Sequence, residues 1–133
     1  KRILKKALPV PQTLNSYRHL LIPVNRQHSH WLTIVIDLHQ HKIIVVDSIR
    51  NKLADSLDVL AIQNFIAAVH DPLAASWPAE VCQTNPQQFN GKDCGLAVCL
   101  NLRVIASQPD ILNPGSPRFE NSFSQVSQAQ GQA

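Results

Sequence analysis

Two apolar segments, 30–38 and 42–49, lie only three residues apart, and their spacing constrains the fold more than any other feature of the sequence. Both segments are rich in Val and Ile, which favour strands, and the intervening His-Gln-His is short enough for a tight turn. We therefore predict a β-hairpin with a third strand over 20–24 beside it. The segments are apolar at nearly every position, so both faces of the sheet should be covered.

After the hairpin, the sequence changes from strand-like to helix-like periodicity. Apolar side chains recur every four residues over 53–70, which predicts an amphipathic helix. Its apolar positions are Leu57, Ala61, Phe65 and Val69. A short strand is expected over 79–84, and a second helix over 94–107 should end before Pro109. This order of strands, helix, strand and helix predicts an α+β fold in which helices pack on a sheet.

The 133-residue chain has the length of one domain with a real core. We expect that core over 20–106, after an irregular basic lead-in at 1–19 and before a mostly disordered tail at 107–133. The chain begins with Lys1 and contains no methionine, so we interpret it as an excised domain, truncated at its N-terminus. Nothing in it resembles a signal peptide or the roughly 18 apolar residues of a membrane helix, which favours an intracellular protein of the nucleus or cytoplasm.

The three cysteines are Cys82, Cys94 and Cys99, an odd number that indicates free thiols in a reducing compartment. A zinc site is the alternative, but the sequence has neither Cys-x-x-Cys nor a histidine pair at finger spacing. Asp93 is a suitable N-cap, which would put Cys94 in a helical first turn, where free N–H groups favour a thiolate. Cys99 points to another side of that helix and is expected in the core.

A cysteine nucleophile needs a base and a group that orients the base. If Leu38 and His41 flank a two-residue loop, Asp47 faces Leu32 across the hairpin. His30 lies two residues from Leu32 on the same face, which makes it a diagonal neighbour of Asp47, about 7 to 8 Å away at the backbone. A three-residue loop would reverse the parity and separate the two side chains.

Each of these residues alone has a simpler interpretation, as a core cysteine, a turn aspartate or a strand histidine. Their combination is more specific: LIPVNRQHSHWLTIVIDLHQHKIIVVDSI is followed by NPQQFNGKDCGLAVC. Over about residues 20–106 the chain resembles the ubiquitin-like-protein-specific cysteine proteases, the SENP-type desumoylating and deneddylating enzymes. The shared features are His-Trp, a later Asp-Ser, and a Gln placed six residues before Cys-Gly.

The resemblance implies a papain-like cysteine protease core in which Cys94 is the nucleophile. His30 would be the general base and later the acid that protonates the leaving amine, while Asp47 would hold the imidazole. The family spacing selects Gln88 as the residue that donates its side-chain amide to the oxyanion, together with the backbone N–H of Cys94. The neighbouring Gln87 would point the other way, so its replacement is expected to be nearly silent.

The resemblance also implies a substrate. Trp31 would line a narrow channel for the Gly-Gly tail of a ubiquitin-like protein, where only glycine lacks a clashing Cβ, and Gly95 would leave room for the substrate backbone. The reaction would be hydrolysis after the C-terminal glycine, either of an isopeptide bond or of a precursor tail. It needs no metal or organic cofactor. The expected partners are SUMO or a Nedd-type modifier and its conjugates, without nucleic acid or membrane.

The chain departs from the family pattern in three places. A longer segment before the first strand, which supplies a second aromatic residue and much of the substrate-gripping surface, is largely absent. Trp77 is not at a matching position, and Lys92 stands where an aromatic residue is common. Two alternatives therefore accompany the protease hypothesis: a degenerate homologue that only binds a ubiquitin-like protein, and a pathogen-type cysteine protease or acyltransferase.

Overall fold

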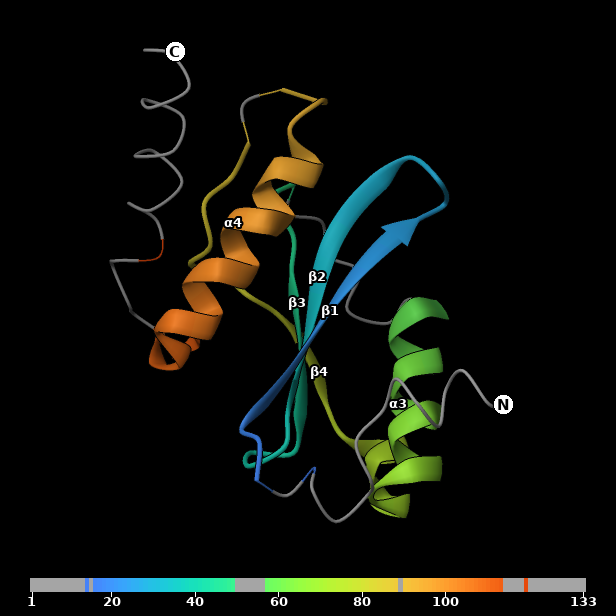
Figure 1. The fold of residues 1–133 in the computed structure, drawn as a ribbon. Helices are drawn as coiled ribbons and strands as arrows, with labels where there is room; N and C mark the ends of the chain where they lie inside the picture. The colour runs from blue at the N-terminus through green and yellow to red at the C-terminus, as the bar shows by residue number, and fades with distance from the viewer. Residues whose placement is uncertain (1–13, 15, 50–56, 89, 114–118, 120–133) are drawn as a thin grey trace.

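The computed structural model describes residues 14, 16–49, 57–88, 90–113 and 119 (Figure 1). At its centre is one four-stranded sheet, in which neighbouring strands are also consecutive in the sequence. The strands are β1 (His19–Arg26), β2 (His30–Asp37), β3 (Lys42–Val46) and β4 (Ala79–Val81). The first three strands are antiparallel, as the predicted hairpin requires, and β4 runs parallel to β3. Each predicted strand is present, although the strands over 42–49 and 79–84 end earlier than expected.

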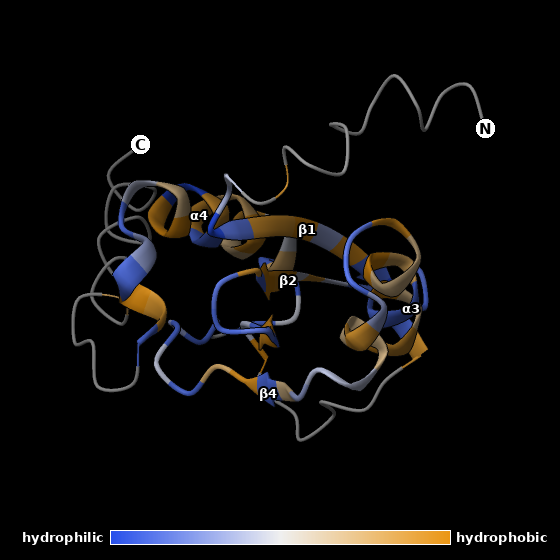
Figure 2. Cartoon of the chain, turned by 90° about the horizontal axis from the view of Figure 1, so that it is seen from below, coloured by the Kyte–Doolittle hydropathy of each residue, from blue (hydrophilic) through white to orange (hydrophobic). Residues whose placement is uncertain are grey.

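Helices cover both faces of this sheet, as its uniformly apolar strands predict (Figures 1 and 2). Helix α3 (Leu57–Val69), followed by the short 3₁₀ helix η1 (Pro72–Ser76), packs on one face. Helix α4 (Cys94–Ser107) and the 3₁₀ helix η2 (Pro109–Leu112) pack on the other. Alternate residues of β2 separate accordingly: Ile34 belongs to the core beneath α3, whereas Val35 belongs to the core beneath α4. The sheet is thus buried between two helical layers.

The hairpin register is the one that a two-residue loop between Leu38 and His41 predicts. Thr33 lies opposite Val46, and Asp37 lies opposite Lys42. The carboxylate Oδ1 of Asp37 accepts hydrogen bonds from the backbone N–H groups of two turn residues, His39 and Gln40. This bonding fixes the turn and, through it, which β2 side chains share a face with those of β3.

The inward face of α3 agrees with the predicted one only in part: Phe65 and Val69 pack against the core, whereas the first half of the repeat does not. Leu57 is 86% exposed, and Ala61 is also exposed, although both belong to the four-residue apolar repeat. The buried residues are Val59 and Ile66 instead, and Phe65 is half-buried beside them. The helix carries apolar residues around most of its circumference, so periodicity alone did not select the face that the sheet covers. Residues 53–56, where the helix was predicted to begin, lie outside the described residues.

The start of the expected C-terminal tail is part of the fold. Pro109–Leu112 form η2, and Ile111 is 3% exposed in the core beneath α4. Phe119 is buried in the same core. The mixture of Ser, Gln and Pro therefore misled the prediction for these positions, because single apolar residues within it reach the core. The segments 114–118 and 120–133 lie outside the described residues. Among the described helices, none is long and apolar enough to cross a membrane.

A buried His19–Asp37 pair at the edge of the sheet predicts a pH-dependent stability. Burial lowers the pKa of His19 below its ordinary 6.5; Arg18 and His39 lower it further, while the Asp37 carboxylate, 3.4 Å from Nε2, opposes the shift. As the pH falls below about 6.5, the unfolded chain takes up this proton before the folded chain does, so the free energy of unfolding should fall. Above that pH, His19 does not make the free energy of unfolding depend on pH.

Urea unfolding at about pH 7.5 and about pH 5.5 tests this expectation. The His19→Gln variant should show a smaller loss of stability at the lower pH than the unchanged chain. Equal losses in the two proteins would mean that other groups cause the whole pH dependence.

Candidate active site

Three segments that are distant in the sequence meet at the end of the sheet where β2 begins (Figure 1). They are the β1–β2 turn, the residues that follow β3, and the residues that precede α4. The β1–β2 turn places His30 there, because Arg26 pairs with His30 across a three-residue turn. Two of the turn residues, Gln27 and His28, have positive φ angles of 56° and 58°. The Arg26 guanidinium bonds both carboxylate oxygens of Asp58, at 2.8 and 3.2 Å, and so joins this end of β1 to the start of α3.

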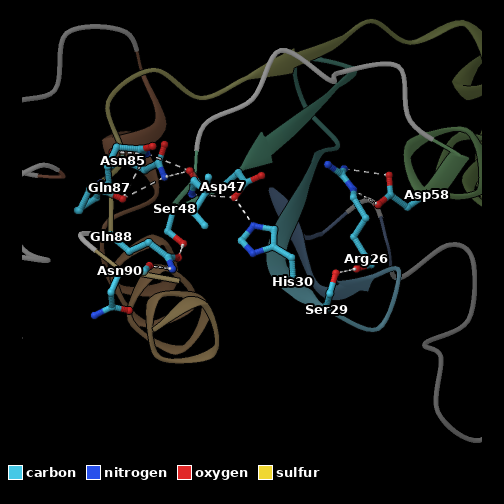
Figure 3. Close-up of polar contacts among 12 residues, drawn as sticks. Arg26, Ser29, His30, Asp47, Ser48, Asp58, Asn85, Gln87, Gln88 and Asn90 are labelled. Carbon is cyan, nitrogen blue, oxygen red and sulfur yellow. Dashed lines mark hydrogen bonds and ion pairs between the residues drawn. The ribbon is translucent and has the colours of Figure 1, made fainter. Parts of the chain in front are cut away.

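His30 and Asp47 are in direct contact, as the hairpin register predicts. His30 Nε2 lies 2.6 Å from Asp47 Oδ1 (Figure 3). The Asp47 side chain is fully buried, and the same Oδ1 accepts a hydrogen bond from the backbone N–H of Ile49 at 3.0 Å. The His30 side chain is 19% exposed. A buried carboxylate bonded to one ring nitrogen fixes the tautomer of an imidazole and leaves the other nitrogen, Nδ1, to exchange protons.

The backbone carbonyl of Asp47 is held as well as its carboxylate. Asn85 Nδ2 donates a hydrogen bond to this oxygen at 2.8 Å, and Gln87 Nε2 donates one at 3.0 Å. Asn85 is 2% exposed. The sequence alone did not identify Asn85 and predicted no role for Gln87. Nothing in the sequence shows that the amides of these residues reach a carbonyl about 40 residues earlier.

Gln88 points away from Gln87, as the alternation of side chains along an extended segment predicts. Its Oε1 accepts a hydrogen bond from Ser48 Oγ, and its Nε2 donates one to the backbone carbonyl of Asn90. Its backbone N–H donates to the carbonyl of Ser48 at 2.9 Å. Figure 3 shows Asp47 and Ser48 between His30 on one side and the 85–90 segment on the other. Ser48 was noticed in the sequence only as part of the Asp-Ser pair.

Cys94 is the first residue of α4, and the boundaries of this helix are the predicted ones. Asp93 occupies the N-cap position, but its side chain makes no capping hydrogen bond. Instead, its Oδ2 accepts from Asn90 Nδ2 at 2.8 Å. Asn90 Oδ1 accepts from the backbone N–H groups of Lys92 and Asp93, at 2.8 and 3.0 Å. The side chain that closes the turn before the helix is therefore Asn90, and not Asp93 as expected.

The three cysteines have different surroundings. Cys94 is 8% exposed, and its Sγ makes no hydrogen bond with any residue that the structure describes. Cys82 is buried, and its Sγ lies 3.6 Å from Thr84 Oγ1. Cys99 is exposed, so the expectation that it lies in the core is wrong: its side of α4 faces solvent instead of the sheet. All three thiols are free.

The two expected substrate-binding residues are accessible. Trp31, the second residue of β2, is 42% exposed beside the β1–β2 turn. A Cβ added at Gly95 would meet no atom within 4 Å, so open space adjoins the first turn of α4. Trp77 is 5% exposed in the core under α3, and its ring stacks on His41 with centroids 4.7 Å apart. Trp77 is therefore a structural residue, in agreement with its mismatch to the family pattern.

Residues 4–114 match the Ulp1 protease family, C-terminal catalytic domain. The chain belongs to the Ulp1 protease family. Ubiquitin-like-specific protease 1 of Saccharomyces cerevisiae is 33% identical over 84 residues, which are 62% of this chain and 14% of that protein. The family resemblance inferred from the sequence is thereby confirmed.

Solved structures of this family have the same fold. A SUMO protease Ulp1 with its catalytic cysteine oxidised to a sulfonic acid is 25% identical with a TM-score of 0.61, over 80% of this chain and 48% of that chain. The C-terminal Ulp1 protease domain in complex with Smt3, the yeast ortholog of SUMO, is 27% identical with a TM-score of 0.59 and the same coverage. The Ulp1-like SUMO protease catalytic domain of Chaetomium thermophilum, at 23% identity and a TM-score of 0.62, agrees in fold over 87% of this chain and 44% of its own.

These structures confirm the predicted α+β fold of the papain-like type. The chain spans about half the length of the solved protease domains it matches and a small part of the curated relative.

Proposed function

We propose that this chain is the catalytic part of a cysteine protease that hydrolyses the bond after the C-terminal glycine of SUMO or a related ubiquitin-like protein. The observation that carries the proposal is the 2.6 Å contact between His30 and the buried carboxylate of Asp47, in a member of the Ulp1 family. This pair occupies the same end of the sheet as the N-terminus of α4, where Cys94 begins the helix (Figure 1). The solved relatives, a SUMO protease with a catalytic cysteine and a protease domain bound to Smt3, support the substrate class.

In the proposed reaction, His30 Nδ1 takes the proton of the Cys94 thiol, and the thiolate attacks the carbonyl carbon of the C-terminal glycine. The carbonyl oxygen becomes an oxyanion, which accepts hydrogen bonds from the Gln88 side-chain amide and the Cys94 backbone N–H. His30 then protonates the leaving amine, and the C–N bond breaks to give a thioester. Water, deprotonated by His30, hydrolyses the thioester and restores the thiol.

Asp47 contributes to each of these steps without exchanging a proton itself. Its carboxylate keeps the imidazole proton on Nε2 in the resting state and stabilises the imidazolium that forms twice per cycle. Catalytic hydrogen bonds are often long before substrate binds, which accounts for a Cys94 thiol that is not yet bonded to His30. Every proton and electron pair in this scheme comes from the chain, the substrate or water, so the expectation of a cofactor-free reaction stands as part of the proposal.

The substrate tail is proposed to enter beside Trp31 and Gly95. The exposed indole would form one wall of a slot, and the open space next to Gly95 would admit the substrate backbone close to Cys94. A slot of this kind favours two consecutive glycines, because any Cβ would collide with its walls. The proposal includes the expected location in the nucleus or cytoplasm.

The proposed nucleophile gives a first test by alkylation. Cys94 should react with iodoacetamide faster than Cys99, although Cys99 is the more exposed thiol, because a base that takes the thiol proton makes the sulfur the stronger nucleophile. Cys82, which is buried with its sulfur beside Thr84 Oγ1, should react slowest. Mass spectrometry of the modified peptides measures the three rates. The His30→Ala variant should slow only Cys94. Faster labelling of Cys99 or Cys82 in the folded protein would count against Cys94 as the nucleophile.

The substrate class is tested with modifiers that carry an electrophile at the C-terminal glycine. SUMO, Nedd-type and ubiquitin probes are each incubated with the unchanged chain and with Cys94→Ser. We expect a covalent adduct of the unchanged chain with the SUMO probe, located at Cys94, and none with ubiquitin. Tight binding of SUMO without an adduct would instead support a binding module. An adduct with another modifier alone would reassign the substrate.

A further inference from the structure

Ser48 is a buried hydroxyl that the proposed mechanism does not use. It is 2% exposed and directly follows Asp47 at the end of β3. Its Oγ bonds Gln88 Oε1, and its backbone carbonyl accepts the Gln88 backbone N–H at 2.9 Å (Figure 3). Ser48 therefore holds both the main chain and the side chain of the residue proposed to donate to the oxyanion.

The contacts of the Gln88 amide define which of its ends faces which neighbour. Its other polar contact is with the backbone carbonyl of Asn90, which can only accept a hydrogen bond, so the amide nitrogen must lie there. The amide oxygen is then directed to Ser48, where the hydroxyl donates. An amide nitrogen carries two N–H groups, and Asn90 uses one of them. The second N–H is left for an oxyanion.

The Asn90 carbonyl is itself anchored close to the proposed nucleophile. The Asn90 side chain bonds the backbone of Lys92 and Asp93 and the carboxylate of Asp93, the residue before Cys94. The Gln88 amide is thus held from two directions: by the end of β3 through Ser48, and by the turn that starts α4 through Asn90. The Ser48 hydroxyl is buried, and the Asn90 carbonyl belongs to a turn closed by its own side chain, so each end of the amide has a fixed partner.

We propose that Ser48 is a positioning residue, which fixes the Gln88 amide with its N–H side available to the oxyanion. This inference rests on the proposed function. Without the hydroxyl, the amide oxygen has no donor to hold it, and an amide that rotates away from the Asn90 carbonyl can present its oxygen to a developing negative charge. Because Ser48 follows Asp47, one two-residue strand end would orient both the imidazole and the oxyanion donor.

The kinetic test combines Ser48→Ala with Gln88→Ala, on SUMO with a fluorogenic C-terminal amide. Ser48→Ala should lower kcat by roughly fivefold to thirtyfold and leave KM within about twofold, because the amide that the hydroxyl positions acts only where charge develops. In the Gln88→Ala background, the same change should alter kcat by less than about twofold, since the group that it positions is gone. Thr33→Val, which removes another buried hydroxyl of the sheet, is the matched control and should leave kcat unchanged.

A second measurement does not depend on activity. The side-chain N–H₂ signals of Gln88, identified in ¹H–¹⁵N spectra by their loss in Gln88→Ala, should be shifted from those of free glutamine in the unchanged chain. In Ser48→Ala they should move to the positions of a freely rotating amide, while Thr33→Val leaves them in place. If Ser48→Ala does not fold, Ser48→Cys, with a weaker donor of similar shape, gives the same comparison.

The outcomes separate this inference from the proposed function. Unaltered Gln88 signals in Ser48→Ala, an unaltered kcat, or an equal loss with and without Gln88 would each overturn the role of Ser48. An unchanged chain that turns over no ubiquitin-like substrate would contradict the proposed function, and the amide signals would still decide whether Ser48 holds Gln88.

Discussion

The Asp47→Asn variant is expected to lose about 10³- to 10⁴-fold in kcat and to fold normally. The carboxylate can only accept a hydrogen bond from His30 Nε2, whereas an amide in its place can donate one and so stabilise the opposite tautomer. The imidazolium would also lose its nearest negative charge. The residues have nearly the same shape, so a fully buried side chain should still fit. Steady-state kcat and KM on SUMO with a fluorogenic C-terminal amide measure the effect.

Asp37→Asn is the matched control for this experiment. Asp37 is also a buried aspartate at a strand end, but its carboxylate bonds the β2–β3 turn, at the end of β2 opposite to His30. Its replacement should lower the thermal midpoint by a few degrees and leave kcat close to that of the unchanged chain. Full activity in Asp47→Asn would mean that another group orients His30. Equal losses in both variants would trace the effect to the fold.

Gln88→Ala should lower kcat by about 10²- to 10³-fold and change KM little, because an oxyanion donor acts mainly in the transition state. The proposed donor is already oriented without substrate, since Ser48 and the Asn90 carbonyl hold the two ends of its amide. Loss of the amide therefore cannot be compensated by a small rotation of a neighbour. The same fluorogenic assay measures kcat and KM.

Two other glutamines make this result specific. Gln83→Ala removes an exposed amide whose only described bond is to the Val81 carbonyl, and should have no effect on kcat. Gln87→Ala was expected from the sequence to be nearly silent, but its bond to the Asp47 carbonyl changes that expectation. We expect a loss of about 0.5 to 1.5 kcal/mol in the free energy of unfolding and less than about a tenfold loss in kcat. A larger loss in kcat at Gln87 than at Gln88 would exchange their proposed roles.

The part of the site that could be predicted best is the His30–Asp47 pair, because it follows from local rules of strand pairing. A short connection and a strict two-residue period are enough to put His30 and Asp47 on one face, and the β2–β3 register agrees with that parity. The helix that begins at Cys94 could also be predicted from the sequence, because a polar turn precedes it and Pro109 follows it. Such features depend on neighbours in the sequence, which is why the sequence was sufficient.

Features that depend on packing between distant segments were not predictable in this way. Leu57 and Cys99 are apolar residues in helices, and only the position of the sheet decides that they face outward. The choice of Asn90 over Asp93 for the turn depends on a backbone geometry that both residue types can serve. The contacts of Asn85, Gln87 and Gln88 with the end of β3 likewise require the segment after β4 to lie beside it.

The parallel pairing of β3 and β4 has a consequence for the order of folding. Ile43 lies opposite Ala79 and Val45 opposite Val81, so the chain must close a long loop that includes α3 before these strands can pair. Hairpin contacts need no such closure and can form in microseconds. Closing the long loop costs conformational entropy, which is offset only when the later contacts form. The His30–Asp47 pair can therefore assemble early, but Gln88 reaches Ser48 only after the crossover is complete. In refolding, the proposed peptidase activity should consequently appear last. A nascent chain that has formed only its hairpin would have His30 beside Asp47 but no Cys94 in place.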